Sequence, residues 1–177
     1  MYSLSFPTPS SEELSDRFDP LDLDERDRVA DFERLADLVL QPYKCGVDVV
    51  KFQPTELPAL FITNESADCL RSVEQSQEES DELWDGILSG IAEEASATSF
   101  ARLHFNYCNP LIRRVSMMDT PKAQQRCIEL LYIQSLLMGH FPLRPPELRL
   151  LNTGLLGLID WATSERSSPK TKDGNDE

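Results

Sequence analysis

The last third of the chain contains a segment that is apolar on nearly every side, and this feature limits the possible folds most. The segment runs from about residue 146 to 163 and reads as a helix. A surface helix of a small domain needs only one apolar stripe, about 100° wide. A helix that is apolar nearly all round must be buried on most sides. The stripes are Leu148, Leu151, Leu155, Leu158 and Ala162, and Leu150, Gly154, Gly157 and Trp161.

The preceding helical segment, about residues 122–139, has the same property. Pro121 predicts its first turn and Gly139 its end. The residues before the two segments are too few to cover both, so the economical arrangement is a four-helix interface with a second copy, related by a two-fold axis. An internal helical hairpin is the alternative, and periodicity does not decide between them. The predicted dimer interface comprises Leu131, Gln134, Leu137, Met138, Leu148, Leu151, Asn152, Leu155, Leu158 and Ile159.

The rest of the pattern predicts an α+β fold with a small, mostly antiparallel three-stranded sheet. Residues 46–53, 59–63 and 102–107 read as strands, because β-branched and aromatic residues alternate there between prolines. A helix ends before Pro42, another is expected at about 78–94, and Asn109-Pro110 begins a short one. Helices pack on the sheet, and the C-terminal helical pair forms the dimer interface.

The expected domain organisation is one folded unit between two tails. Residues 1–25 form an acidic tail that contains serine and proline, and residues 164–177 form a disordered polar tail. The folded domain is expected at 26–163, a length that suits one hydrophobic core.

Charge and hydropathy exclude several classes of partner. The chain has 17 Lys and Arg against 31 Asp and Glu, which gives a net charge of −14. Such a surface repels nucleic-acid phosphates and anionic lipid, so we expect neither nucleic acid nor membrane as a partner. No apolar run approaches the ~18 residues of a membrane helix, and the N-terminus does not resemble a signal peptide. We therefore expect a cytoplasmic protein.

Several short motifs follow one another in a characteristic order along residues 57–152. They are Leu57-Pro58-Ala59-Leu60, Leu103-His104-Phe105-Asn106, Asn109-Pro110-Leu111-Ile112-Arg113-Arg114, Glu129-Leu130-Leu131-Tyr132-Ile133-Gln134 with Leu136-Leu137, and Leu150-Leu151-Asn152. This order resembles the C-terminal domain of the heat-shock protein 90 family, especially its bacterial, high-temperature protein G type, and the similarity spans about residues 44–162. The order differs at one corner, where Tyr107, Cys108 and Asn109 separate Asn106 from Pro110, whereas typical members have proline directly after this asparagine.

The resemblance implies a molecular chaperone that takes part in protein folding and the stress response. In the family this domain is the constitutive dimer interface, and it contributes a client-contacting segment that corresponds here to about residues 64–75. The implied partners are a second copy, unfolded client proteins, and a separate chain with the ATPase and middle domains. The candidate client-contact residues are Leu70, Val73 and Trp84.

The sequence predicts no enzymatic activity and no cofactor in this chain. The full-length family uses ATP, but none of the seven glycines forms a GxG arrangement that could wrap phosphates. One alternative is a small cytosolic enzyme that uses His104 and Cys108, and another is an acidic decoy that occupies a nucleic-acid-binding protein. On a strand, residues four apart are ~13 Å apart, so these two meet only if the chain turns at Asn106.

Overall fold

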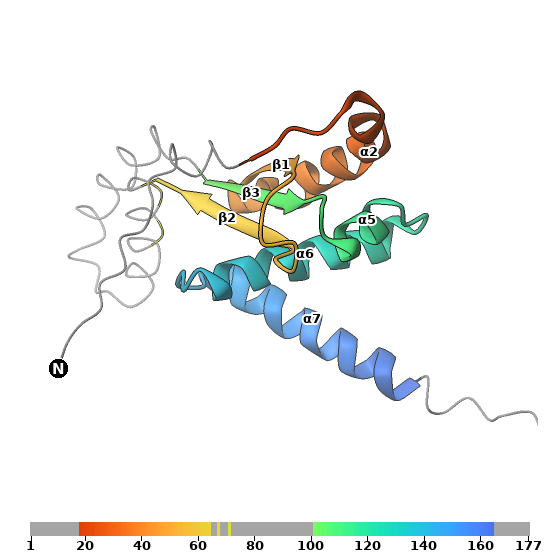
Figure 1. The fold of residues 1–177 in the computed structure, drawn as a ribbon. Coiled ribbons are helices and arrows are strands. Elements are labelled where there is room, and N and C mark those ends of the chain that lie inside the picture. Colours follow the sequence, from red (N-terminus) through yellow and green to blue (C-terminus); the bar gives the residue numbers. More distant parts are fainter. Residues whose placement is uncertain (1–17, 65–66, 68–70, 72–100, 165–177) are drawn as a thin grey trace, which may run out of the picture.

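The computed structural model describes residues 18–64, 67, 71 and 101–164, and the following account is limited to these residues. The expected helix at 78–94, the C-terminal tail from residue 165, and Leu70, Val73 and Trp84 lie outside them. The predicted α+β class is confirmed (Figure 1). The elements are α2 (Leu23–Leu40), a 3-10 helix (Gln41–Tyr43), β1 (Gly46–Val50), β2 (Ala59–Thr63), β3 (Ala101–Asn106), α5 (Pro110–Ser116), α6 (Pro121–Met138) and α7 (Pro145–Ser164).

The sheet has the order β1-β3-β2, so the strand that comes last in the sequence lies in the centre. Strand β3 pairs with β1 in the parallel direction, with Leu103 opposite Val47, and with β2 in the antiparallel direction, with Leu103 opposite Phe61. The sheet is therefore mixed, and the prediction of a mostly antiparallel sheet is wrong. Parallel neighbours need a long connection between them, and the stretch from residue 51 to 100 supplies it.

The hydrophobic core lies between one face of the sheet and the helices α2 and α6. Phe32 of α2 meets Phe105 of β3 with ring centroids 5.0 Å apart, and Tyr132 of α6 meets Phe61 of β2 at 6.0 Å. Phe32, Phe105 and Tyr132 are at most 1% exposed. Alternation along the strands aims one set of side chains at the helices, as the pattern of period two predicts. This buried set is Val47, Val49, Ala59, Phe61, Leu103 and Phe105.

The folded part begins earlier than the expected boundary at residue 26. α2 starts at Leu23 because Asp22 and Glu25 form a reciprocal capping box, with hydrogen bonds of 2.8 and 2.9 Å. Leu21 is buried in the core, and Phe18 packs on Phe52 with ring centroids 5.5 Å apart. Acidic and polar composition suggested a tail here, but the cap satisfies the first amide groups of the helix.

Two asparagines at the end of β3 hold the loop between β1 and β2. The buried Asn106 amide donates to the carbonyl groups of Phe52 and Leu57, and its oxygen accepts from the Phe52 amide. Asn109 donates to the carbonyl of Thr55 and caps the start of α5 with its oxygen. The residues between Asn106 and Pro110 thus include a second asparagine, Asn109, that holds the loop between β1 and β2 by hydrogen bonds.

Candidate functional site

The helix α7 leaves the end of α6 and projects away from the rest of the structure (Figure 1). Its first half packs on α6 at Gly154, where an added Cβ atom would lie 2.5 Å from Cδ2 of Leu130. The absent side chain therefore permits a close approach of the two helices at this point. Beyond the crossing, every residue from 155 to 164 is exposed. The helix has one packed half and one uncovered half.

The exposed surface of α7 is strongly apolar. Successive helical residues turn by about 100°, which places Leu148, Leu155 and Ile159 on one stripe beside the side that faces α6. Leu158 and Trp161 continue the side that faces α6 beyond the point where α6 covers it. Single exposed hydrophobic residues are common, but a contiguous row of this kind marks an interaction site. The large hydrophobic residues of α7, each 48–60% exposed, are Leu148, Leu155, Leu158, Ile159 and Trp161 of these stripes, and Leu156 on the side away from α6.

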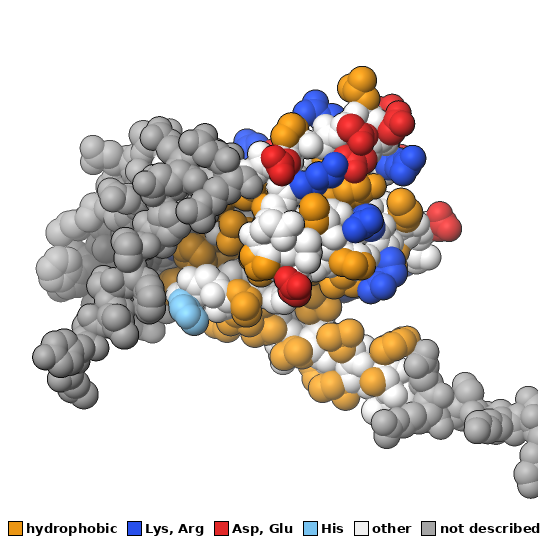
Figure 2. Space-filling model, in the orientation of Figure 1, with side chains coloured by type: hydrophobic (Ala, Val, Ile, Leu, Met, Phe, Trp, Pro, Cys, Tyr) orange, Lys and Arg blue, Asp and Glu red, His pale blue; other side chains and the backbone are white. Residues whose placement is uncertain are grey.

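The surface is also nearly neutral. From residue 148 to 164 the helix carries one cation, Arg149, and one anion, Asp160. Figure 2 shows hydrophobic side chains following one another along α7, whereas the charged side chains on this face gather around α2 and α5. In a chain with a net charge of −14, this is a surface that another acidic molecule can approach without like-charge repulsion.

The predicted dimer-interface residues divide into two groups. Leu131 is 6% exposed and belongs to the core of its own chain, and Leu151 is half-buried against that core. The others lie on the surface of α6 and α7: Gln134, Leu137, Met138, Leu148, Asn152, Leu155, Leu158 and Ile159. The prediction left out the exposed Leu156 and Trp161. Trp161 belonged to an apolar stripe, but its exposure depends on the angle at which α7 leaves α6.

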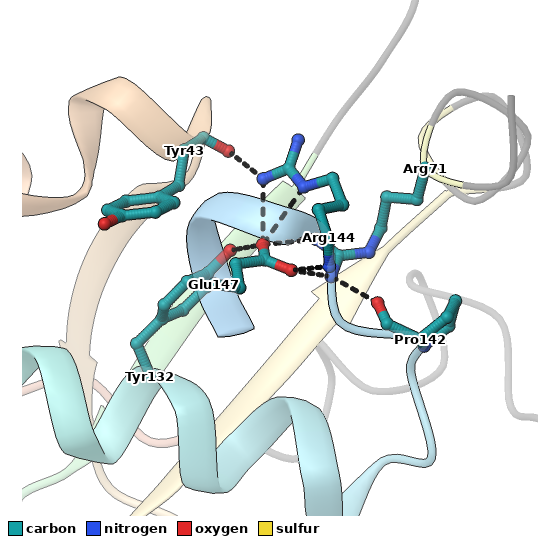
Figure 3. A network of polar contacts seen from close by, with 6 residues as sticks. All are labelled: Tyr43, Arg71, Tyr132, Pro142, Arg144 and Glu147. Carbon is teal, nitrogen blue, oxygen red and sulfur yellow. Dashed lines mark hydrogen bonds and ion pairs between the residues drawn. The ribbon is translucent and has the colours of Figure 1, made fainter. Parts of the chain in front are cut away.

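A buried carboxylate anchors the first turn of α7 (Figure 3). Glu147 is fully buried, and its two oxygens accept six hydrogen bonds. Arg71 donates through both terminal nitrogens, at 3.1 and 2.8 Å. Tyr132 donates its hydroxyl at 2.6 Å. Arg144 donates its backbone amide at 2.8 Å and its guanidinium at 3.1 and 2.9 Å.

The local sequence around Glu147 favours this arrangement. Arg144 precedes the helix, Pro145 is its first residue, and Glu147 is its third. A glutamate at the third position can accept from the amide that precedes the helix, and proline suits the first turn. This pattern could have been recognised in the sequence. Nothing in the sequence indicated that Arg71 and Tyr132 reach the same carboxylate.

The Glu147 side chain is held in its charged form. Burial by itself raises the pKa of this carboxyl, but the donors from Tyr132 and Arg144 outweigh burial and bring the pKa below its ordinary value of 4.5. Burial and the adjacent carboxylate raise the pKa of the Tyr132 hydroxyl, which therefore keeps the proton that it donates. Buried charges persist in proteins when they are paired and hydrogen-bonded, as they are here.

The structure places His104 and Cys108 in different surroundings. The His104 ring stacks on Phe18 with centroids 4.7 Å apart, and its Nδ1 atom lies 3.6 Å from a carboxylate oxygen of Asp48. Burial lowers the pKa of His104, so the ring is neutral at pH 7. Cys108 lies in the turn after β3, where its amide donates to Asn106. The ionisable group beside the His104 ring is therefore the carboxylate of Asp48.

The thiols and acids of the described residues do not gather into a metal site. No group of three or more His, Cys, Asp or Glu side chains within the described ranges is placed to hold a metal ion. Burial raises the pKa of the Cys45 thiol to about 12 and also raises that of Cys127, so both stay protonated at neutral pH.

Neither a scan against protein-family models nor a search of curated proteins gives a match for this chain. Of the helices that the structure describes, none combines the length and the apolar character needed to cross a membrane.

Proposed function

We propose that the chain is a homodimerisation module in which α6 and α7 pack against the same helices of a second copy. The observation that carries this proposal is the uncovered half of α7, a nearly neutral helix that exposes six large hydrophobic side chains. A two-fold axis lets the same surface cover itself, so each helix supplies the cover that the other lacks.

Burial of apolar surface supplies the driving force for pairing. Two copies together present twelve large side chains that are about half exposed, and burying them corresponds to roughly 9–18 kcal/mol of gross transfer free energy. Exposed Leu137 and Met138 at the end of α6 enlarge the surface. The loss of translational and rotational freedom opposes association, so only part of this transfer free energy appears as affinity. We expect a dimer with a sub-micromolar Kd.

We further propose that this module is the C-terminal dimerisation region of a heat-shock-protein-90-type chaperone that acts on unfolded proteins in the cytoplasm. The support is the resemblance of the motifs, together with their positions in the fold. Asn106 ends β3, Asn109-Pro110 begins α5, and the motif from Glu129 to Leu137 lies within α6. In that family ATP hydrolysis belongs to another domain, and this chain contributes pairing and client contact.

The dimer is tested by sedimentation of the wild type and of Leu155→Glu over a range of concentrations. The variant places an unpaired carboxylate at the centre of the interface, close to its symmetry mate, and we expect it to be a monomer. Leu23→Glu is the matched control, because Leu23 is 80% exposed in the first turn of α2, where a carboxylate is favoured. A wild type that remains a 20.1 kDa monomer at tens of micromolar contradicts the proposal.

The chaperone role is tested separately, by light scattering after a denatured model protein is diluted into the chain without nucleotide. We expect the wild type to slow aggregation in proportion to its concentration, because the module contributes client contact. Serum albumin at equal mass is the control for nonspecific crowding. An aggregation curve identical to that control leaves dimerisation standing and removes client binding.

A further inference from the structure

The network around Glu147 joins parts of the chain that lie far apart in the sequence. Arg71 follows β2, Tyr132 lies in α6, and Arg144 donates at 3.1 Å to the carbonyl oxygen of Tyr43 at the end of the 3-10 helix. Arg71 also donates at 2.9 Å to the carbonyl of Pro142, in the connector between α6 and α7. The bonds to Glu147 converge on the first turn of α7, and the bonds to Tyr43 and Pro142 tie their donors to neighbouring segments (Figure 3).

Small changes at this end produce large displacements at the other. From Glu147 to Trp161 the helix extends ~21 Å at 1.5 Å per residue. A tilt of ~10° about the first turn therefore moves Trp161 by ~4 Å, a large fraction of the 8–10 Å that separates packed helices. The residues beyond Gly154 are exposed, so the direction of the helix is set by its first half. The contacts there are the Glu147 network, the packing of Leu150 and Leu151 on the core, and the approach of Gly154 to Leu130.

The donors of the network do not have equal roles. Arg144 lies three residues before Glu147, so most of its bonds stay within the start of the helix. Arg71 and Tyr132 belong to other elements and tie the carboxylate to the rest of the structure. Arg71 makes the larger attachment, because its two terminal nitrogens grip both carboxylate oxygens while its guanidinium lies 5.5 Å from the centre of the Phe61 ring.

We propose that Arg71 is a positioning residue for dimerisation: by clamping Glu147 it fixes the direction of α7 and so the geometry in which two copies pair. This inference rests on the proposed function. Arg71 itself is 5% exposed and so is not a surface residue of the apolar row on α7. Its effect on pairing is transmitted through the ion pair.

The charges of the network determine which substitution is informative. Two guanidinium groups, of Arg71 and Arg144, share one carboxylate. Arg71→Gln leaves one cation for one anion, so the buried charge remains paired and the fold is retained. The control is Arg102→Gln, which breaks a 2.7 Å ion pair with Asp48 on the sheet and away from α7.

The first measurement is the dimer Kd of the full chain by sedimentation. We expect Arg71→Gln to raise it at least about tenfold, because the lost bonds are charged and buried. Arg71→Lys keeps the positive charge but cannot donate two parallel hydrogen bonds to the carboxylate. Its dimer Kd should therefore lie between those of the wild type and Arg71→Gln. Arg102→Gln should leave the Kd unchanged. An unchanged Kd for a folded Arg71→Gln overturns the inference.

The second measurement reports the direction of α7 without a dimer. Spin labels at Asp31→Cys on α2 and Asp160→Cys on α7 are placed in the Leu155→Glu chain, with its other accessible cysteines replaced by serine. We expect a narrow distance distribution with Arg71 and a broad or shifted one with Arg71→Gln. Identical distributions overturn the inference, even if the wild type is a monomer and the proposed function has already failed.

If circular dichroism shows that Arg71→Gln is unfolded, Tyr132→Phe takes its place in both measurements. That change removes a single 2.6 Å hydrogen bond to Glu147 and preserves the ring packing. A higher dimer Kd and a broader spin-label distance distribution for Tyr132→Phe then support the positioning of α7 by the network. If both measurements match those of the wild type, the inference is contradicted.

Discussion

The helices α6 and α7 are neighbours of similar length and similar apolar content, but their surroundings are opposite. α6 buries eight of its residues, among them Ile128, Tyr132 and Leu136. α7 buries one, and that residue is the charged Glu147. The sheet and α2 cover α6, whereas α7 meets α6 along its first half and then leaves it. Apolar content therefore shows that a helix needs cover, and the packing around it shows where the cover comes from.

The largest expected effect concerns the one buried residue of α7. Glu147→Gln leaves Arg71 and Arg144 buried without an anion, and we expect unfolding free energy to fall by about 3–5 kcal/mol in urea denaturation. The matched change in α6 is Glu129→Gln, at a side chain that is 10% exposed, pairs with the 56% exposed Arg126 and accepts a hydrogen bond from Gln125. That change should cost clearly less than Glu147→Gln, because the cation that loses its partner can be solvated by water. Equal effects would mean that Glu147 does not anchor the helix.

The next largest expected effect is the difference in stability loss between a leucine-to-alanine substitution in α6 and one in α7. Leu136 of α6 is fully buried, and Leu136→Ala should cost about 2–5 kcal/mol of unfolding free energy because it leaves a cavity. Leu155 of α7 is 48% exposed, so Leu155→Ala should cost much less at a protein concentration too low for dimers. It should instead raise the dimer Kd. A large loss of monomer stability from Leu155→Ala would show that its own chain covers this side chain.

The smallest effect sharpens the comparison between the two halves of α7. An alanine at Gly157 meets no atom within 4 Å, so Gly157→Ala should stabilise the monomer by about 1 kcal/mol through helix propensity. An alanine at Gly154 would displace the Leu130 side chain, so the same substitution should give a smaller gain or none. Thermal unfolding of the two variants below the dimer Kd measures the difference. Equal gains would indicate that α7 does not pack closely on α6.

Local signals in the sequence determined most of the element positions and the α+β class. Pro121 marks the first turn of α6, and alternation in 46–53, 59–63 and 102–107 marks the strands, because these features act within a few residues. The surplus of apolar faces in the C-terminal helices was also visible in the sequence. The expected boundary at residue 26 cut off the first turn of α2, because residues 1–25 read as an acidic tail, although Asp22 and Glu25 form the cap of this helix.

Only the tertiary structure decided how these elements meet. Alternation gives the faces of a strand but not its neighbours, so the central place of β3 and its parallel pairing with β1 could not be read from the sequence. Periodicity likewise placed Leu131 on an interface, whereas its own core covers it. The convergence of Arg71, Tyr132 and Arg144 on Glu147 depends on contacts as far as 76 residues apart. The direction of α7, and with it the exposure of Leu156 and Trp161, depends on the contacts of its first half, at Glu147, Leu150, Leu151 and Gly154, because a rigid helix points where its packed part holds it.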